Sequence, residues 1–191
     1  MKRLTLLIFL SLLFIQQALA QDKYEKESRI KRAEVPEKAV RFIDSAKLTK
    51  KLKWYEEQGL RLTTYEVKTC HNKSKYSIEF DASGSIEDIE IDRKWNEIPA
   101  DTQSIINSFL DSIYQKKKIR KVQIQFTGSS DELHKMLTQP NSTVTVTTKY
   151  EIVVKGKKNN EYEMVEYLFS DNGKMERRSK IILKNTDNLE Y

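Results

Sequence analysis

Closely spaced carboxylates are the residues of this chain best suited to chemistry. They occur as the pairs Glu56-Glu57 and Glu87-Asp88 and again at Glu161 and Glu163. Two carboxylates facing each other across a cleft can hydrolyse glycosides as acid and nucleophile or base. The same residues also suit turns and the wet faces of strands. We therefore expect solvated charge at these positions and no catalytic residues.

Sulfur and imidazole ligands are scarce. The chain has one cysteine, Cys70, and two histidines, His71 and His134. Cys70 and His71 are adjacent, so a strand would point them to opposite faces. No Cys-x-x-Cys or His-x-x-x-His spacing is present, and a zinc site would need further ligands in a tetrahedral array. We expect no metal site, and we expect Cys70 to be buried as a small apolar side chain.

Cofactor motifs are missing as well. Five scattered glycines cannot build a glycine-rich phosphate loop, and no Gly-x-Ser-x-Gly elbow is present. The polar stretches that begin at Asp81 and Asp171 are too short for a calcium loop and are typical of hairpin turns. The sequence therefore predicts no cofactor.

The first twenty residues have the pattern of a secretory signal peptide. Lys2 and Arg3 precede an apolar run from residue 4 to residue 15, and Ala18-Leu19-Ala20 follows as a small-residue cleavage motif. Twelve apolar residues are too few to span a bilayer comfortably. We expect cleavage after Ala20 and export to the periplasm or the exterior, with no membrane span in the mature chain.

Composition limits the partner classes. The formal charge of +6 falls to 6 − 2 = +4 when Lys2 and Arg3 are removed, and Glu and Asp are interspersed among the cations nearly everywhere. A nucleic-acid-binding chain would gather its cations into a patch. We therefore expect no nucleic-acid partner and a surface of mixed, solvated charge.

Hydrophobic periodicity divides the mature chain into two similar parts. After a charged lead at residues 21–33, which we expect to be flexible, apolar residues recur every three or four positions over 39–48 and then every second position over 52–54, 65–69, 76–80 and 89–91. A second helical stretch over 105–113 precedes alternating segments at 122–126, 144–154, 165–169 and 174–183. Residues 129–143 interrupt the second part as an insertion, with a short helix capped by Ser129 or Ser130.

The fold class predicted from this order is α+β. Each part would form one helix followed by a four-stranded antiparallel sheet, with the helices on one face and the other face open. We assign the first unit to residues 34–95 and the second to residues 96–191. Glu34-Val35-Pro36 and Glu97-Ile98-Pro99 begin the two helices at an offset of 63, which suggests a tandem repeat.

These motifs resemble a known family. The Glu-[Val/Ile]-Pro helix start, the Tyr-Glu-Val and Tyr-Glu-Ile strands at Tyr65 and Tyr150, and the Phe-x-x-x-Gly hairpins at Phe80 and Phe169 are similar to those of PepSY-like repeats. These repeats are also described as β-lactamase-inhibitor-protein-like (BLIP-like) and occur in small exported bacterial proteins. The resemblance covers roughly residues 35–183. It implies a helix packed on an antiparallel sheet in each unit and an exported protein, and it implies little about activity.

The open face of the sheet is the candidate site. Large side chains lose most water at the centre of a contact, so they anchor partners. We expect a partner to bind the following residues: Tyr55, Val153, Met164 and Leu168 as anchors, with Lys51, Lys53 and Lys68 as a rim that steers an acidic partner. The competing expectation is that the insertion at 129–143 covers the apolar residues.

The function expected from these observations is a non-catalytic binding or inhibitory module outside the cytoplasm. Its partner would be a protein or a cell-envelope component, whose identity the sequence does not give. The alternative is an envelope hydrolase that uses carboxylates on the sheet face, such as Glu66 or Glu79.

Overall fold

A single curved β-sheet forms the body of the protein in the computed structural model. The structure describes residues 20–23, 26–48, 51–59, 62–139 and 141–181. Within them, ten strands lie in the order β1-β10-β9-β8-β7-β6-β5-β4-β3-β2. Every neighbouring pair is antiparallel except β1 with β10, which run parallel. The α+β class and the antiparallel sheet are therefore confirmed.

The first part contains an antiparallel meander, formed by the strands that pair in succession from β2 to β6. In chain order they are β1 (Ala20–Lys23), β2 (Lys26–Ile30), the 3-10 helix η1 (Arg32–Glu34), α2 (Glu37–Ser45), β3 (Lys53–Gln58), β4 (Thr63–His71), β5 (Ser74–Phe80) and β6 (Ile86–Asp92). The turn between β4 and β5 has positive φ at Asn72 (46°) and Lys73 (65°), the pattern of a two-residue hairpin.

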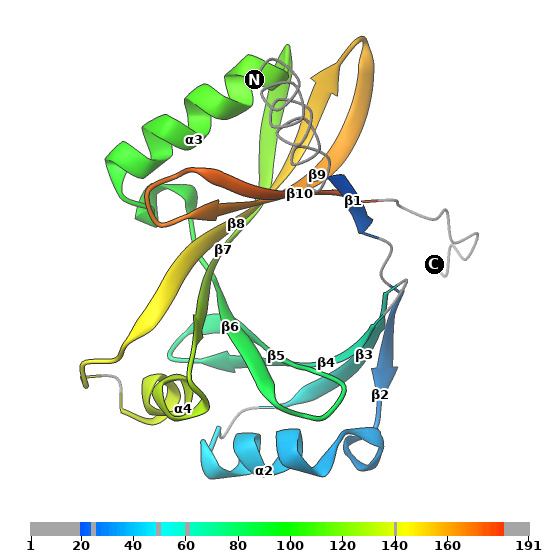
Figure 1. Cartoon of the computed structure of the whole chain (residues 1–191), viewed down its shortest axis with the longest axis vertical. Coiled ribbons are helices and arrows are strands. Elements are labelled where there is room, and N and C mark those ends of the chain that lie inside the picture. The colour runs from blue at the N-terminus through cyan, green and yellow to red at the C-terminus, as the bar shows by residue number, and fades with distance from the viewer. Residues whose placement is uncertain (1–19, 24–25, 49–50, 60–61, 140, 182–191) are drawn as a thin grey trace, which may run out of the picture.

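The second part continues the same sheet. Its elements are η2 (Trp95–Glu97), α3 (Ala100–Ile113), β7 (Lys116–Gly128), α4 (Ser130–Thr138), β8 (Val146–Lys158), β9 (Glu161–Ser170) and β10 (Met175–Ile181). The helices lie on the outer side of the sheet, and its other side curves around the centre of the molecule (Figure 1). None of the helices in the described ranges is long and apolar enough to cross a bilayer.

The two helix starts have the same local geometry, for the reason their motifs suggest. Glu34 Oε2 accepts a hydrogen bond from the backbone N–H of Lys31 at 2.7 Å, which closes the short turn before the helix. Glu97 does the same for Lys94 at 2.6 Å. The proline that follows can begin a helix because its missing N–H would have no partner in the first turn.

Each Phe-x-x-x-Gly hairpin packs against one of these helix starts. Gly84 and Gly173 have φ of 79° and 81°, a conformation that glycine adopts without strain. A Cβ on Gly84 would lie 2.8 Å from the Cβ of Pro36, and one on Gly173 would lie 3.1 Å from Ile105 Cγ2. The glycines are thus needed both for the turn and for the close approach of the helix.

The core lies between the helices and the outer face of the sheet, in two clusters. One gathers the buried apolar residues under α2 and α4, among them Ile43, Ile78 and Phe80, and the other those under α3, among them Leu110 and Tyr167. Phe126, expected under the second helix, packs in the first cluster instead, because α4 adds Leu133 and Leu137 there.

Three sequence expectations differ from the structure. Residues 21–33 were expected to be a flexible lead, but residues 26–30 form β2 and residues 32–34 form η1, since Ile30 packs on the first core cluster and β2 pairs with β3. Ile105, placed in the buried stripe, is 49% exposed. Cys70 is exposed on β4, because its strand position points it away from the helices. The signal peptide expected at residues 1–20 lies outside the described residues up to position 19, and Ala20 begins β1.

Candidate functional site

The inner face of the sheet, opposite the helices, carries a continuous band of buried polar side chains. Its members come from β4 to β9 and alternate along each strand with the apolar core residues. They are Glu66, Glu79, Asp88, Glu90, Gln123, Gln125, Glu151 and Glu166. We call this set the carboxylate face. All of them except Glu79 are less than 9% exposed.

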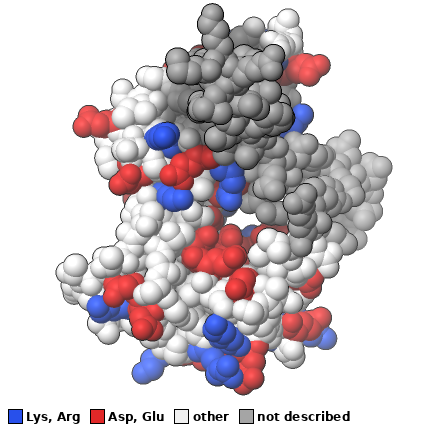
Figure 2. All heavy atoms as spheres, viewed as in Figure 1, with Lys and Arg blue, Asp and Glu red and all other residues white. Residues whose placement is uncertain are grey.

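Strand register brings these side chains together from distant parts of the sequence. Glu66 is paired with Glu79 across β4 and β5, and Glu79 with Asp88 across β5 and β6. Gln125 on β7 is opposite Glu90 on β6. The space-filling view shows acidic side chains gathered at the hollow in the middle of the molecule (Figure 2). A chain that is basic overall therefore presents an acidic inner face.

One acidic group on this face surrounds a lysine. Lys68 Nζ donates to Glu27 Oε2 at 2.7 Å and lies 2.9 Å from Glu66 Oε2. Burial by itself lowers the pKa of this ammonium, but the hydrogen bonds and attraction from Glu27 and Glu66 outweigh burial and raise the pKa overall. The ring of Tyr55 adds a cation–π contact, with Nζ 4.8 Å from its centroid. The site thus holds a cation between carboxylates and an aromatic ring.

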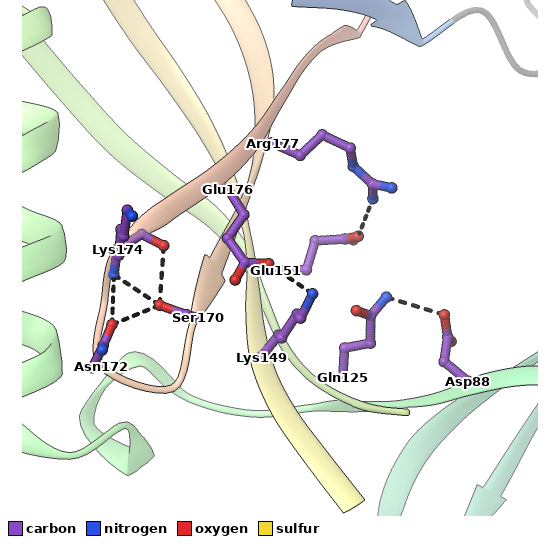
Figure 3. Close-up of polar contacts among 9 residues, drawn as sticks. All are labelled: Asp88, Gln125, Lys149, Glu151, Ser170, Asn172, Lys174, Glu176 and Arg177. Atoms are coloured by element: carbon purple, nitrogen blue, oxygen red, sulfur yellow. Dashed lines mark hydrogen bonds and ion pairs between the residues drawn. The ribbon is translucent and has the colours of Figure 1, made fainter. Parts of the chain in front are cut away.

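A second acidic group lies beside the first. Glu79, Asp88 and Glu90 each offer an oxygen within 4.8 Å of the others. Gln125 Nε2 donates to Asp88 Oδ2 at 3.1 Å (Figure 3). The same nitrogen lies 3.5 Å from Glu90 Oε1. The amide of Gln125 therefore lies close to both carboxylates, which are two residues apart on β6 and share one face.

Beyond Gln125, the face continues with ion pairs to Arg177 and Lys149. Arg177 Nη2 lies 3.9 Å from a carboxylate oxygen of Glu151 and 3.9 Å from one of Glu166. Lys149 Nζ lies 2.7 Å from Glu176 Oε2 (Figure 3). Arg177 lies on β10 and Lys149 on β8, so the cations of this half of the face come from the strands of the second part.

Gln123 is the one neutral side chain of the carboxylate face with an unused acceptor. It is 2% exposed and lies between Asp92 on β6 and Glu151 on β8. Its Oε1 has no hydrogen-bond partner among the described residues. A buried amide oxygen without a donor costs free energy, so a donor placed there by a ligand would be favoured.

The residues predicted as a partner site that belong to strands lie on this inner face, yet their roles differ from the expectation. Lys51 and Lys53 are exposed, whereas Lys68 is half-buried and paired with acids instead of standing on a rim. Val153 and Leu168 are buried at 8% and 7% exposure, so they offer little apolar contact area. Met164, partly exposed, is opposite Lys155.

The insertion does not cover these residues. α4 begins where Ser129 Oγ accepts a hydrogen bond from the N–H of Glu132, as the capping motif indicated. It packs on the outer side of the sheet, where Leu133 and Leu137 join the core and His134 contacts Ser45 and Phe42. The expectation that residues 129–143 shield the apolar part of the inner face is therefore wrong.

Oxygen ligands are the only means by which this face could hold a metal. Besides Glu79, Asp88 and Glu90, the group Glu27, Glu57 and Glu66 brings three carboxylates within 4.8 Å. Such ligands suit hard cations like Ca²⁺. In the group of Glu27, Glu57 and Glu66, Lys68 already supplies the positive charge. Within the described residues Cys70 and the histidines form no ligand cluster, since His71 packs on Tyr76 and His134 on Phe42.

Sequence reasoning missed Gln123, Gln125, Glu151, Glu166 and Arg177. The alternation within β7, β8 and β9 places the first four on the inner face, so that signal was available. The alternation alone did not identify a site, because polar residues that alternate with core residues along a strand are ordinarily solvated. Arg177 could not be assigned, because a bulge between Met175 and Arg177 shifts the register of β10.

Comparison with solved structures finds similarity to a BLIP-like protein from Bacteroides fragilis. The two are 18% identical, with a TM-score of 0.46, over 81% of this chain and 92% of that chain. No family model and no curated protein matches the sequence.

Proposed function

We propose that this protein is an exported binding module that recognises a cationic segment of a protein or cell-envelope partner through its carboxylate face. One observation carries the proposal. The inner face gathers carboxylates from the five strands β4, β5, β6, β8 and β9 into a hollow, and it already seats Lys68 between Glu27 and Glu66. A partner's Lys or Arg would meet the same chemistry.

The low exposure of the face determines the shape of the partner. Charged groups held away from water are costly unless cations and donors compensate them. A flat surface could not reach side chains less than 9% exposed. Lys and Arg reach inward on long apolar stems, and the fork of Arg pairs with two acceptors at once. The partner would therefore present protruding basic side chains.

The charge of this partner is opposite to the one the lysine rim suggested. Lys51 and Lys53 remain at the edge of the face, together with Tyr55, and we assign them to its periphery. Met164, which is partly exposed, would contact the apolar stems of the inserted side chains, and the buried Val153 and Leu168 of the same face would add little contact area. The partner-binding set then combines these residues with the carboxylate face.

Export, the division into two diverged repeats and the absence of a catalytic role belong to the same proposal. The basic, apolar and Ala-x-Ala segments at the N-terminus support export. The matching geometry at Glu34 and Glu97, and at Gly84 and Gly173, supports duplication of a unit. A binding role without catalysis is supported by carboxylates that hold cations in place, as with Lys68.

Titration with defined peptides tests the proposal. Hexa-arginine should bind, hexa-glutamate should not, and the affinity should fall as salt is raised from about 50 to about 300 mM, because charge attraction is screened. The double variant Asp88→Asn with Glu90→Gln should bind hexa-arginine at least about tenfold more weakly. The control is Glu37→Gln, which removes one carboxylate from the outer surface of α2. Equal loss in the control, or preference for hexa-glutamate, would defeat the proposal.

A hydrolase remains the second candidate, favoured by the close approach of Glu79, Asp88 and Glu90. Two carboxylates about 5–5.5 Å apart can cleave glycosides with retention. A panel of glycoside and ester substrates separates the candidates. Turnover that is lost on Glu79→Gln, or on Glu66→Gln, would favour the enzyme over the binding module.

A further inference from the structure

A second hollow lies away from the carboxylate face, where β7 extends past its neighbour β6. The two strands are paired only from Asp88 with Thr127 to Asp92 with Gln123. β7 begins earlier, at Lys116, so its first residues have no strand beside them on that side. The chain crosses this gap at residues 93–95. The hollow left between the crossing and β7 has a volume of about 630 Å³.

Cations line this hollow on both sides. The crossing contributes Arg93 and Lys94, and β7 contributes Lys117, Arg120 and Lys121. Trp95, Ile119 and Val122 supply the apolar part of the lining, and Asp92 is its one acid. A bulge between Ile119 and Lys121 inserts Arg120 as an extra residue in β7. Bulges of this kind redirect a side chain from its regular strand direction.

Part of this positive charge has a partner in the protein. Lys117 pairs with Asp111 and donates to the carbonyl of Asn107 at 3.1 Å. Arg93 Nη1 donates to Ser74 Oγ at 2.8 Å and to the carbonyl of Asp92 at 3.1 Å. For Lys94, Arg120 and Lys121, the described part of the chain provides no ion pair. Three like charges around one hollow create a positive potential there.

Protection of an unpaired strand edge would explain only half of this arrangement. Lysines on an exposed edge discourage pairing with other chains, which accounts for the cations of β7. It does not account for Lys94, which lies on the opposite side of the hollow at the start of η2. Because Lys94, Arg120 and Lys121 line the same hollow, an anion placed in it would meet all three.

We propose that this hollow binds a phosphate group. A tetrahedral dianion accepts hydrogen bonds in several directions, so it can be held from both sides, by Lys94 and by Arg120 with Lys121. A guanidinium pairs with two phosphate oxygens through its fork, and an ammonium binds as a point charge. The phosphate belongs to a small ester or to a lipid headgroup. The site is independent of the carboxylate face and of the function proposed for it.

The indole signals of the two tryptophans give a direct test by NMR. Trp95 lines the hollow, and Trp54 is buried in the first core cluster, so it serves as an internal control. Titration of the protein with glycerol 3-phosphate at constant ionic strength should shift the Trp95 signal with saturation and leave Trp54 unchanged. The double variant Arg120→Ala with Lys121→Ala should weaken this binding at least tenfold, and Arg41→Ala on α2 should not.

Vesicles distinguish the two sources of phosphate. If the protein sediments with vesicles of phosphatidic acid but not with vesicles of phosphatidylcholine alone, and the double variant does not sediment with either, the phosphate belongs to a lipid headgroup. Saturation by glycerol 3-phosphate assigns the soluble ester. No response in either arm, a Trp95 shift that sodium chloride reproduces, or full binding by the double variant would overturn the proposal.

Discussion

The two faces of the sheet bury side chains to a similar extent by different means. On the outer face, Ile152 and Tyr167 are fully buried under α3 in a close-packed apolar cluster. On the inner face, Glu151 and Glu166 are 5% and 7% exposed, although no described helix lies over them. Curvature of the strands crowds the inner side chains against one another. Burial therefore involves apolar side chains packed under helices on one face and polar side chains on the other.

The largest effect should come from a large-to-small change on the outer face. Ile152→Ala is expected to lower the free energy of unfolding by about 2–5 kcal/mol, because it leaves a cavity in a packed core. Its neighbour Val153 faces the inner side, and Val153→Ala should cost only about 1 kcal/mol. Urea denaturation of the two variants provides the comparison. Equal losses would mean that both faces are packed cores.

The hairpin glycines Gly84 and Gly173 test how tightly each hairpin packs against its helix on the outer side. Gly84→Ala should destabilise the fold by about 2–3 kcal/mol, because it combines a left-handed backbone with a clash against Pro36. Gly173→Ala has the same backbone strain, but Ile105 is half-exposed and can move, so about 1–2 kcal/mol is expected. Thermal denaturation gives the order. A larger loss for Gly173→Ala would show that its turn is the more tightly packed one.

A carboxylate on the outer face shows how such a group is held when it serves structure alone. Glu163 accepts hydrogen bonds from the Tyr114 hydroxyl at 2.9 Å and from Arg178 Nη2 at 2.8 Å. Burial raises the pKa of Glu163, but these two bonds outweigh burial and lower it overall. The burial of Tyr114 and its bonds to Tyr167 and Glu163 raise the pKa of that phenol.

Because the pKa of Glu163 is lowered in the folded state, the effect of Glu163→Gln on stability should depend on pH. A carboxyl with a lowered pKa in the folded state stabilises the protein above its unfolded pKa, near 4.3. At neutral pH the wild type should be more stable than Glu163→Gln by about 1 kcal/mol. This difference in the free energy of unfolding should shrink as the pH falls below the unfolded pKa and through the lower pKa of the folded state. Denaturation at pH 7 and at about pH 3 measures the difference. A constant difference would show that the ionised form of Glu163 is not the stabilising one.

The smallest effect on stability is expected on the inner face. Asp88→Asn removes one of several neighbouring negative charges and keeps both the size of the side chain and an oxygen that can accept from Gln125, so the free energy of unfolding should change by less than about 1 kcal/mol. A loss of several kcal/mol would make the carboxylate face a structural network instead of a binding surface. The denaturation midpoint, compared with that of Ile152→Ala, decides between them.

The alternation of residue types was enough to predict most of the outer face. Ile43, Ile78, Phe80, Leu110 and Tyr167 recur with helix or strand periods and are buried where expected. Both Glu-[Val/Ile]-Pro starts and the cap at Ser129 also follow from local chemistry that needs no distant contact.

The inner face could not be predicted in the same way. Its character depends on how far ten strands curve and on which strands are neighbours, and both are global properties. A polar residue such as Glu151 looks the same in sequence whether it lies on an open face or in a hollow. For the same reason β2 was missed, because the few apolar residues of this edge strand do not show that it pairs with β3.

Side-chain amide signals of glutamine in NMR spectra offer the most direct test of the central claim, that the inner face binds a cationic partner. Gln123 and Gln125 lie on the carboxylate face, whereas Gln103 lies at the start of α3, where its Nε2 donates to the carbonyl of Ile98 at 2.7 Å. We predict that hexa-arginine shifts the signals of Gln123 and Gln125 with saturation and leaves that of Gln103 in place. Unchanged signals for Gln123 and Gln125 at saturating peptide, or shifts confined to Gln103, would contradict the account.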